Sequence, residues 1–342
     1  MNKFIVPMIV VLAFVIAACA SAQGDWADRV SMSGYLQFRY DGGDRLPTTQ
    51  DEFEDFSLRR AFFNLAASAG DRTNVVLTLA SFDRLEDVAA LGYTSDDLII
   101  YNLFVDYNIN DQWSARFGQV PTYFGLEAWQ QSCDRLALER AMILEGDWGA
   151  NNASGFYFLG PSDRGLWLKR AGEENQPDIY LGVYNGQGRA SDVDSSKNYS
   201  VDLKWEREWG IAGLSWFDGA LTGPAGKNSR HAVDAYVKFI RSPWDVQAEW
   251  ADGRMFGSDR DGWYIQVAKV REDKTWIPYL KYEEFSSDGA GGLDYDAIRA
   301  GVAWQLDDNN EVTLEVADVD YTPAGGATQE AVKFGLSWQV GF

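Results

Sequence analysis

Apolar and polar residues alternate one by one along one stretch near the end of the chain, EAVKFGLSWQVGF. Every second residue from Val332 to Phe342 is apolar or aromatic, and the residues between them are small or polar. Successive side chains of a β-strand point to opposite faces, so this period of two predicts a strand with one apolar face. Soluble β-sandwiches contain such strands as well, so the choice of fold depends on the rest of the chain.

The same alternation recurs from residue 30 onward, in segments separated by turn-forming residues. Many of the apolar stripes carry an aromatic residue at one or both ends, as expected at the two lipid–water boundaries of a membrane barrel. The predicted strands are 30–40, 55–69, 73–82, 97–108, 112–120, 164–171, 178–186, 197–206, 210–218, 231–241, 244–252, 262–271, 274–285, 294–306, 310–321 and 329–342. In the second strand the apolar residues change parity between Leu58 and Phe63, which predicts a bulge near Arg59-Arg60.

The gaps between these strands alternate in length. Short turns such as 70–72 and 207–209 alternate with longer loops, of which 121–163 is the longest. Short turns on one side and long loops on the other are typical of outer-membrane barrels. We therefore expect an all-β fold, a closed antiparallel transmembrane β-barrel of about sixteen strands in which the last strand pairs with the first. The long third loop is expected to fold toward the lumen.

Composition favours this membrane barrel over a soluble sandwich. Aromatic residues make up 14% of the chain and charged residues 24%, and no linker or shift in composition marks a second domain. After residue 22 no apolar run reaches the ~20 residues that a transmembrane helix needs. The net charge of −21 makes nucleic acid a poor partner.

The N-terminal segment has the pattern of an export signal. A lysine precedes an apolar run over residues 4–18, and a small-residue cleavage site ends at Ala22. We expect residues 1–22 to be a signal peptide and residues 23–342 to form one outer-membrane barrel domain. The alternative is a lipoprotein cleavage box that ends at Cys19, with a lipid attached to that cysteine.

Three parts of the chain resemble the phosphate-selective porin O and P family. Residues 56–67, FSLRRAFFNLAA, resemble its early strand with a paired arginine, and residues 115–127, ARFGQVPTYFGLE, resemble the segment that leads into its third loop. Residues 163–170, DRGLWLKR, and 179–189, IYLGVYNGQGR, resemble its Arg-Gly strand and its Asn-Gly hairpin. The resemblance implies a sixteen-stranded trimeric channel for anions or small solutes in a bacterial outer membrane.

The long loop is the main candidate for a pore constriction. A barrel of this size leaves an aqueous lumen, and a segment as long as 121–163 is rarely a passive connector. We expect it to fold into the lumen, with a solvated external flap as the alternative, and to include a short helix between Cys133 and Glu145. The candidate constriction residues are Glu127, Asp134, Arg135, Glu139, Arg140 and Glu145. The loop holds six acidic residues and two basic ones, which favours cations over phosphate.

Parity along the strands assigns further charged side chains to the lumen. The candidate pore-lining residues are Arg39, Arg116, Asp106, Lys238, Glu249, Arg299 and Lys333. The same faces carry Lys169, Lys204, Lys281, Asp202, Asp234, Asp245, Glu283 and Glu315. Mixed charges on a pore wall either set a transverse field for ions or simply solvate the wall and pair across strands.

These features predict an outer-membrane porin for passive diffusion of small hydrophilic solutes or ions, with no catalytic residue, metal site or cofactor. The single histidine, His231, lies near Ser229 and Asp234, but no Gly-x-Ser-x-Gly elbow accompanies it. An outer-membrane hydrolase and a structural or adhesive surface barrel remain the alternatives. The expected partners are outer-membrane lipid, the permeating solutes and further copies of the chain in a homotrimer.

Overall fold

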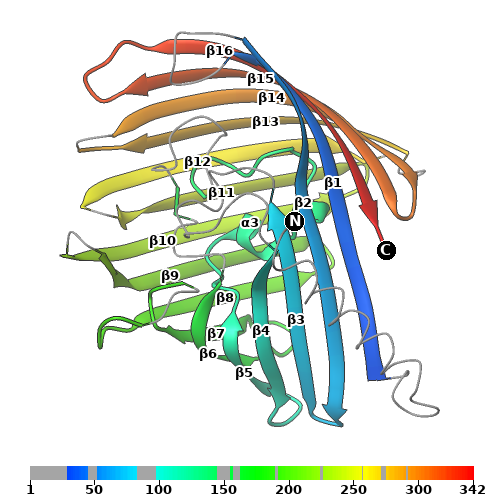
Figure 1. The fold of residues 1–342 in the computed structure, drawn as a ribbon, viewed down its shortest axis with the longest axis vertical. Coiled ribbons are helices and arrows are strands. Elements are labelled where there is room, and N and C mark those ends of the chain that lie inside the picture. Colours follow the sequence, from blue (N-terminus) through cyan, green and yellow to red (C-terminus); the bar gives the residue numbers. More distant parts are fainter. Residues whose placement is uncertain are drawn as a thin grey trace, which may run out of the picture.

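The computed structural model describes residues 29–44, 52–82, 98–144, 155–156, 162–188, 192–223, 226–255, 257–270, 275–289 and 292–342. These residues form sixteen antiparallel strands in one closed barrel (Figure 1). Each strand pairs with its neighbours in the sequence, and β1 pairs with β16 to close the ring. The predicted fold class, strand number and closure are therefore confirmed. The predicted signal peptide and Cys19 lie outside the described residues.

The strands are β1 (Val30–Asp44), β2 (Glu52–Gly70), β3 (Thr73–Phe82), β4 (Ile99–Asn108), β5 (Trp113–Val120), β6 (Asp163–Arg170), β7 (Asp178–Tyr184), β8 (Asn198–Arg207), β9 (Gly210–Gly223), β10 (Gly226–Arg241), β11 (Trp244–Met255), β12 (Ser258–Lys269), β13 (Trp276–Ser287), β14 (Leu293–Asp307), β15 (Asn310–Pro323) and β16 (Gln329–Gly341). Between β5 and β6 lie the short helix α3 (Leu126–Trp129) and the 3-10 turn η2 (Ser132–Asp134). Within the described ranges no helix has the length and apolar character needed to cross a membrane.

Strand β16 shows how the alternation produces a two-faced wall. Trp338 on its outer face is 51% exposed, whereas Ser337 on its inner face is buried. Backbone hydrogen bonds join Gly34 and Phe342 in both directions, each at 3.0 Å, and so extend the seam between the first and last strands. A Cβ atom at Gly34 would collide with the Phe342 ring and with the backbone of strand β2, so this close approach requires glycine.

Tryptophan side chains are exposed on the outer surface, and several of them lie near the short turns. The exposed tryptophans among the described residues are Trp209, Trp216, Trp244, Trp250, Trp263, Trp276, Trp304 and Trp338. Trp276 and Trp304, on neighbouring strands, stack with their ring centroids 4.8 Å apart. Tryptophan is enriched where a membrane protein meets the lipid headgroups, so this outer surface suits a bilayer.

A β-bulge in β2 changes which residues face the lumen. Gln37 of β1 pairs with Arg60, whereas the next residue, Phe38, pairs with Leu58, so Arg59 is the inserted residue. The bulge predicted from the change of parity is confirmed. Before the bulge Phe56 faces outward and is 82% exposed, and at the bulge two successive arginines are both buried on the lumen side.

Deletion of Arg59 is expected to remove the bulge and to keep the facing of the strand. Without the inserted residue, the pairs Arg60–Gln37 and Leu58–Phe38 become consecutive, so Phe56 still faces outward. The variant should therefore give the compact folded form that migrates differently on a denaturing gel before and after boiling. Deletion of Val316 from a regular part of β15 should give little or none of that form, because it turns Leu314 toward the lumen. Loss of the gel shift in the Arg59 deletion variant would contradict the assignment of the bulge.

Several strands run further on the loop side than predicted. The sequence predicted a loop between Asp218 and His231, but β9 continues to Gly223 and β10 begins at Gly226. Cross-strand pairing continues through this region and includes Lys227 opposite Thr222. The residues here lack an apolar stripe, which explains why alternation did not reveal them, but backbone pairing needs no apolar face.

Candidate functional site

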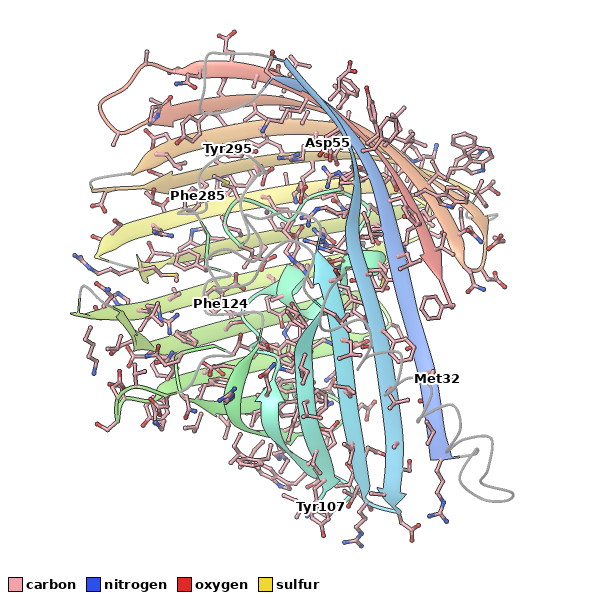
Figure 2. All side chains as sticks on the ribbon, in the orientation of Figure 1. Met32, Asp55, Tyr107, Phe124, Phe285 and Tyr295 are labelled. Carbon is pink, nitrogen blue, oxygen red and sulfur yellow. The ribbon has the colours of Figure 1, made fainter. Side chains whose placement is uncertain are left out.

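The first half of the long loop between β5 and β6, residues 121–144, enters the barrel. Helix α3 lies within the ring of strands (Figure 1), half of residues 121–144 are buried, and nearly all the others are half-buried. Phe124 belongs to the same buried cluster as Phe285 of β13 and Tyr295 of β14 (Figure 2). A segment that packs against the inner wall in this way occupies lumen space and narrows any path through the barrel.

The loop takes a different backbone form from the predicted one. The sequence predicted a helix between Cys133 and Glu145, but 135–141 contains no helical turn, and the four-residue helix α3 lies before it. The backbone N–H groups here bind side-chain carboxylates instead of helical carbonyls. Leu138 N donates to Glu315 at 3.1 Å and Met142 N donates to Glu283 at 2.8 Å. These wall contacts, which lie far away in the sequence, therefore replace local helix formation.

A buried ion pair fixes the start of the loop. Lys281 of β13 is fully buried, and its Nζ donates to Glu127 Oε1 at 3.0 Å and to the Glu139 carbonyl oxygen at 3.4 Å. Burial alone would raise the pKa of Glu127, but the positive charges of Lys281, Arg135 and Arg140 outweigh it and lower that pKa below its usual value. Glu127 is therefore ionised, and its carboxylate links the loop to Lys281 of the wall.

The middle of the loop is held by arginines of the first two strands. Glu139 accepts hydrogen bonds from Arg39 Nη1 at 2.6 Å and from Arg59 Nη2 at 3.4 Å. Arg39 also donates to Asp41 at 2.6 Å. Ser132 accepts a hydrogen bond from Arg60 at 2.8 Å, so both arginines of the bulge bind the loop. The negative charge of Glu139 is thus matched by cations of the wall.

A third contact connects the wall carboxylates to one another. Arg299 of β14 donates to Glu283 at 2.7 Å and to Glu315 at 3.2 Å. These are the two carboxylates that accept the backbone N–H groups of Met142 and Leu138. Arg299 therefore orients the acceptors that hold the loop and balances part of their charge.

The predicted constriction residues occupy different environments. Arg135 and Arg140 are buried, and Arg140 donates to the Glu127 carbonyl oxygen at 2.5 Å. Asp134 is exposed at the end of η2. Glu145 lies outside the described residues.

The predicted pore-lining residues divide into two groups. Arg39, Glu249 and Arg299 are buried against the loop. Glu249 accepts hydrogen bonds from Leu126 N at 2.6 Å and Glu127 N at 3.3 Å.

In the second group Arg116 and Lys238 lie nearer the short turns, whereas Lys333 lies toward the long-loop end of β16. Arg116 forms a bidentate pair with Asp106, at 2.6 and 2.8 Å, and its guanidinium lies over the Phe104 ring. Lys238 pairs with Asp245 at 3.2 Å. Lys333 is half-buried on β16 opposite Gly43. Parity identified the face of these residues but gave no information on their depth.

An aromatic cluster holds the other side of the loop. Tyr123 and Trp129 stack with their ring centroids 3.7 Å apart, and the ring centroids of Trp129 and Tyr180 of β7 lie 4.6 Å apart. The rings of Tyr123 and Trp167 of β6 pack edge to face, with their centroids 6.4 Å apart. The Lys204 ammonium lies 5.2 Å from the Trp129 ring centroid. Together with the ion pairs, these contacts attach the loop to walls on both sides of the barrel.

Alternation along the strands did not predict that both arginines of the bulge face the lumen. A simple alternation turns one of Arg59 and Arg60 outward, yet both bind the loop. The change of parity between Leu58 and Phe63 was the signal that could have identified them, because a bulge places two successive side chains on the same face.

The candidate hydrolytic residues do not come together. His231 and Ser229 are exposed, whereas Asp234, on the opposite face of β10, is buried inside the barrel. Because a hydrolytic triad needs its histidine within hydrogen-bond reach of an acid, this grouping does not form a hydrolase site.

Acidification is expected to weaken the attachment of the loop through Glu127. Its lowered pKa means that Glu127 stabilises the folded state above its ordinary pKa of about 4.3, and that this contribution is lost as the pH falls through the folded-state value. The thermal midpoint of the gel-shift transition should therefore fall more steeply below about pH 4 in the unmodified protein than in Glu127→Gln. Parallel pH curves for the two proteins would contradict this role.

The sequence pattern described as phosphate-selective porin O and P matches residues 30–210, more than half of the chain. A search of curated protein sequences finds no significant match.

Solved structures share the fold at low sequence identity. An anion-selective porin from Comamonas acidovorans is 9% identical with a TM-score of 0.67, over 92% of this chain and 99% of the porin. The outer-membrane channel DcaP of Acinetobacter baumannii is 11% identical with a TM-score of 0.63, over 92% and 97% of the two chains. The trimer form of OmpT, an outer-membrane protein of Vibrio cholerae, is 12% identical with a TM-score of 0.60, over 92% and 99%.

Proposed function

The chain belongs to the phosphate-selective porin O and P family and is an outer-membrane porin, and from this premise we propose that small hydrophilic solutes diffuse through it passively with little preference for either sign of charge. The observation that carries the proposal is a pairing of charges. In the part of the lumen wall near the short turns, each described basic side chain of strands β5, β6, β8 and β10 has an acidic partner. The pairs are Arg116–Asp106, Lys169–Asp178, Lys204–Glu206 and Lys238–Asp245.

The loop charges support the same proposal. A cation preference was expected from an excess of acidic residues over 121–163. Within the described part of this loop, Glu127 and Glu139 are both bound by wall cations. A carboxylate that is neutralised at close range contributes little field to the path, because opposite charges cancel beyond their separation. We therefore propose weak selectivity in place of a strong preference for cations or for phosphate.

We propose that the channel carries out no covalent chemistry. Two further points of the proposal concern its oligomeric state and its processing on export. A trimer form is known for the similar OmpT of Vibrio cholerae, and we propose a homotrimer embedded in outer-membrane lipid here. We propose that residues 1–22 are removed on export and that residues 23–342 form one barrel domain. The mass of the purified protein, measured on the denatured chain and on the detergent-solubilised complex, tests both points.

Liposome swelling tests the proposed function. Proteoliposomes diluted into iso-osmotic sugar or amino-acid solutions should swell, with rates that fall as solute size rises. Small neutral, anionic and cationic solutes of similar size should enter at similar rates. Liposomes that contain the folded barrel and swell no faster than empty ones would exclude passive diffusion. Swelling in anionic solutes alone would replace weak selectivity with strong anion preference.

A further inference from the structure

Three acidic side chains lie together inside the barrel, against the start of the loop. Asp202 of β8, Asp234 of β10 and Glu249 of β11 are each 2% exposed. Asp202 and Asp234 lie opposite the same residue of β9, Ser215, so they face one another across that strand. Burying several carboxylates costs free energy unless donors, cations or protons compensate for it.

Two of the three carboxylates have hydrogen-bond donors. Asp202 accepts from the Ser215 hydroxyl at 2.6 Å and from the Tyr236 hydroxyl at 3.3 Å. Glu249 accepts from the Tyr264 hydroxyl at 2.9 Å and from the loop N–H groups of Leu126 and Glu127. These contacts stabilise Asp202 and Glu249 as anions.

Asp234 differs from its neighbours. Neither oxygen of its carboxyl group receives a hydrogen bond from any donor in the described part of the chain. Its hydrogen-bonding neighbour is the Glu249 carboxyl group, which is itself an acceptor. Gly125 of the loop lies directly over the pair, since a Cβ atom there would collide with Glu249 Oε1 and lie 3.0 Å from Asp234 Oδ2.

A proton satisfies this arrangement. Two carboxyl groups in contact in a buried site cannot both be ionised without strong repulsion, and a shared proton supplies the donor that the pair lacks. A metal ion is the other possible counter-charge. The described residues contain no group of three or more His, Cys, Asp or Glu side chains arranged to hold one.

We propose that Asp234 and Glu249 share one proton and that this proton latches the loop, so that its loss at alkaline pH releases residues 125–127 and widens the channel. The proposal rests on the channel function proposed above. With the proton present, Asp234 donates to Glu249, and Glu249 keeps its hydrogen bonds to the loop. Without the proton, two adjacent negative charges repel each other at the point where the loop is attached.

The surroundings increase this repulsion. Asp202 of β8 and Glu127 of the loop add negative charge on either side of the pair. The remaining neighbours are hydroxyl groups, from Ser215 of β9, Tyr236 of β10 and Tyr264 of β12. The basic side chains nearby are already engaged: Lys281 of β13 binds Glu127, and Lys204 of β8 binds Glu206.

Single-channel conductance of the full chain against pH tests the latch. Buried carboxyl groups can hold a proton up to about pH 9, so recordings should run from about pH 6 to above that value. We expect the conductance of the unmodified protein to rise toward alkaline pH. In Asp234→Asn the side-chain amide donates to Glu249 at every pH, so the rise should be lost and the low conductance retained.

Two further variants make the test specific. Glu249→Gln removes the partner of the shared proton and should also lose the rise. Asp245→Asn, which changes another lumen-facing carboxylate on the same strand as Glu249, should keep it. A rise that persists in both Asp234→Asn and Glu249→Gln would overturn the latch, and so would a flat profile in the unmodified protein. A flat profile would leave the porin function intact, whereas absence of any conductance at every pH would overturn both.

Discussion

Replacing Lys281 with methionine is expected to detach the loop from the wall and to raise the single-channel conductance. Lys281 is fully buried, and its ammonium group is the wall cation that binds Glu127. Methionine fills similar volume but leaves Glu127 buried without that partner. Breaking one side of a buried ion pair typically costs about 3–5 kcal/mol, so the attached state of the loop should be strongly disfavoured.

A double-mutant cycle separates the ion pair from simple packing. Lys281→Met combined with Glu127→Gln removes both charges, so the double variant should regain much of the stability and low conductance that Lys281→Met loses. Lys269→Met, which changes an exposed lysine at the end of β12, is the matched control and should conduct like the unmodified protein. If Lys281→Met alone conducts normally, the ion pair does not hold the loop in the lumen.

Replacing Glu139 with glutamine is expected to shift the channel toward anions. Glu139 balances the guanidinium groups of Arg39 and Arg59, at 2.6 and 3.4 Å. With glutamine in its place Arg39 keeps Asp41 as a partner, but one unit of the positive charge of the two arginines loses its compensation. One uncompensated charge in a narrow aqueous path produces a potential of the order of kT or more, which changes the ratio of anion to cation permeability on the order of threefold. The reversal potential between unequal KCl solutions measures this ratio.

The control for this prediction is a carboxylate of the same kind outside the lumen. Glu173 lies exposed in the turn between β6 and β7, so Glu173→Gln should leave the reversal potential unchanged. A Glu139→Gln channel with the selectivity of the unmodified protein would mean that Arg39 and Arg59 do not face the path of the ions.

The wall of the barrel was largely predictable because its rules are local. Alternation and turn lengths identified all sixteen strands, and the change of parity between Leu58 and Phe63 located the bulge. The errors lie at strand ends such as Gly223 and Gly226, where pairing continues through polar residues. An apolar stripe reports contact with lipid, so alternation loses its signal where the strands rise beyond the membrane.

The loop was much less predictable because its conformation depends on distant residues. Leu138 N and Met142 N bind carboxylates of β15 and β13, and these contacts prevent the helix that the local sequence favours. Alternation along the strands showed that Lys281 and Arg299 face the lumen, but it did not show their position along the axis of the pore. Depth decides which side chains reach the loop, so charge counts along the sequence overstated the negative charge there.

The sequence also did not predict that the buried carboxyl group of Asp234 receives no hydrogen bond from a donor in the described part of the chain. Its parity indicates only that it faces the lumen, as Asp245 does. The two differ because Asp245 has Lys238 as a partner at 3.2 Å, whereas Asp234 has only another carboxyl group beside it. Partners of this kind are set by the register of neighbouring strands and by the loop, which a single sequence does not specify.

The conductance of the purified full-length protein in a planar lipid bilayer tests the central claim, a water-filled path through a barrel narrowed by its own loop. We expect discrete conductance steps whose size grows in proportion to KCl concentration, because ions in such a path move as they do in bulk solution. The gel shift on boiling should first establish that the sample is folded. Folded protein that inserts into the bilayer and conducts at no salt concentration would contradict the claim.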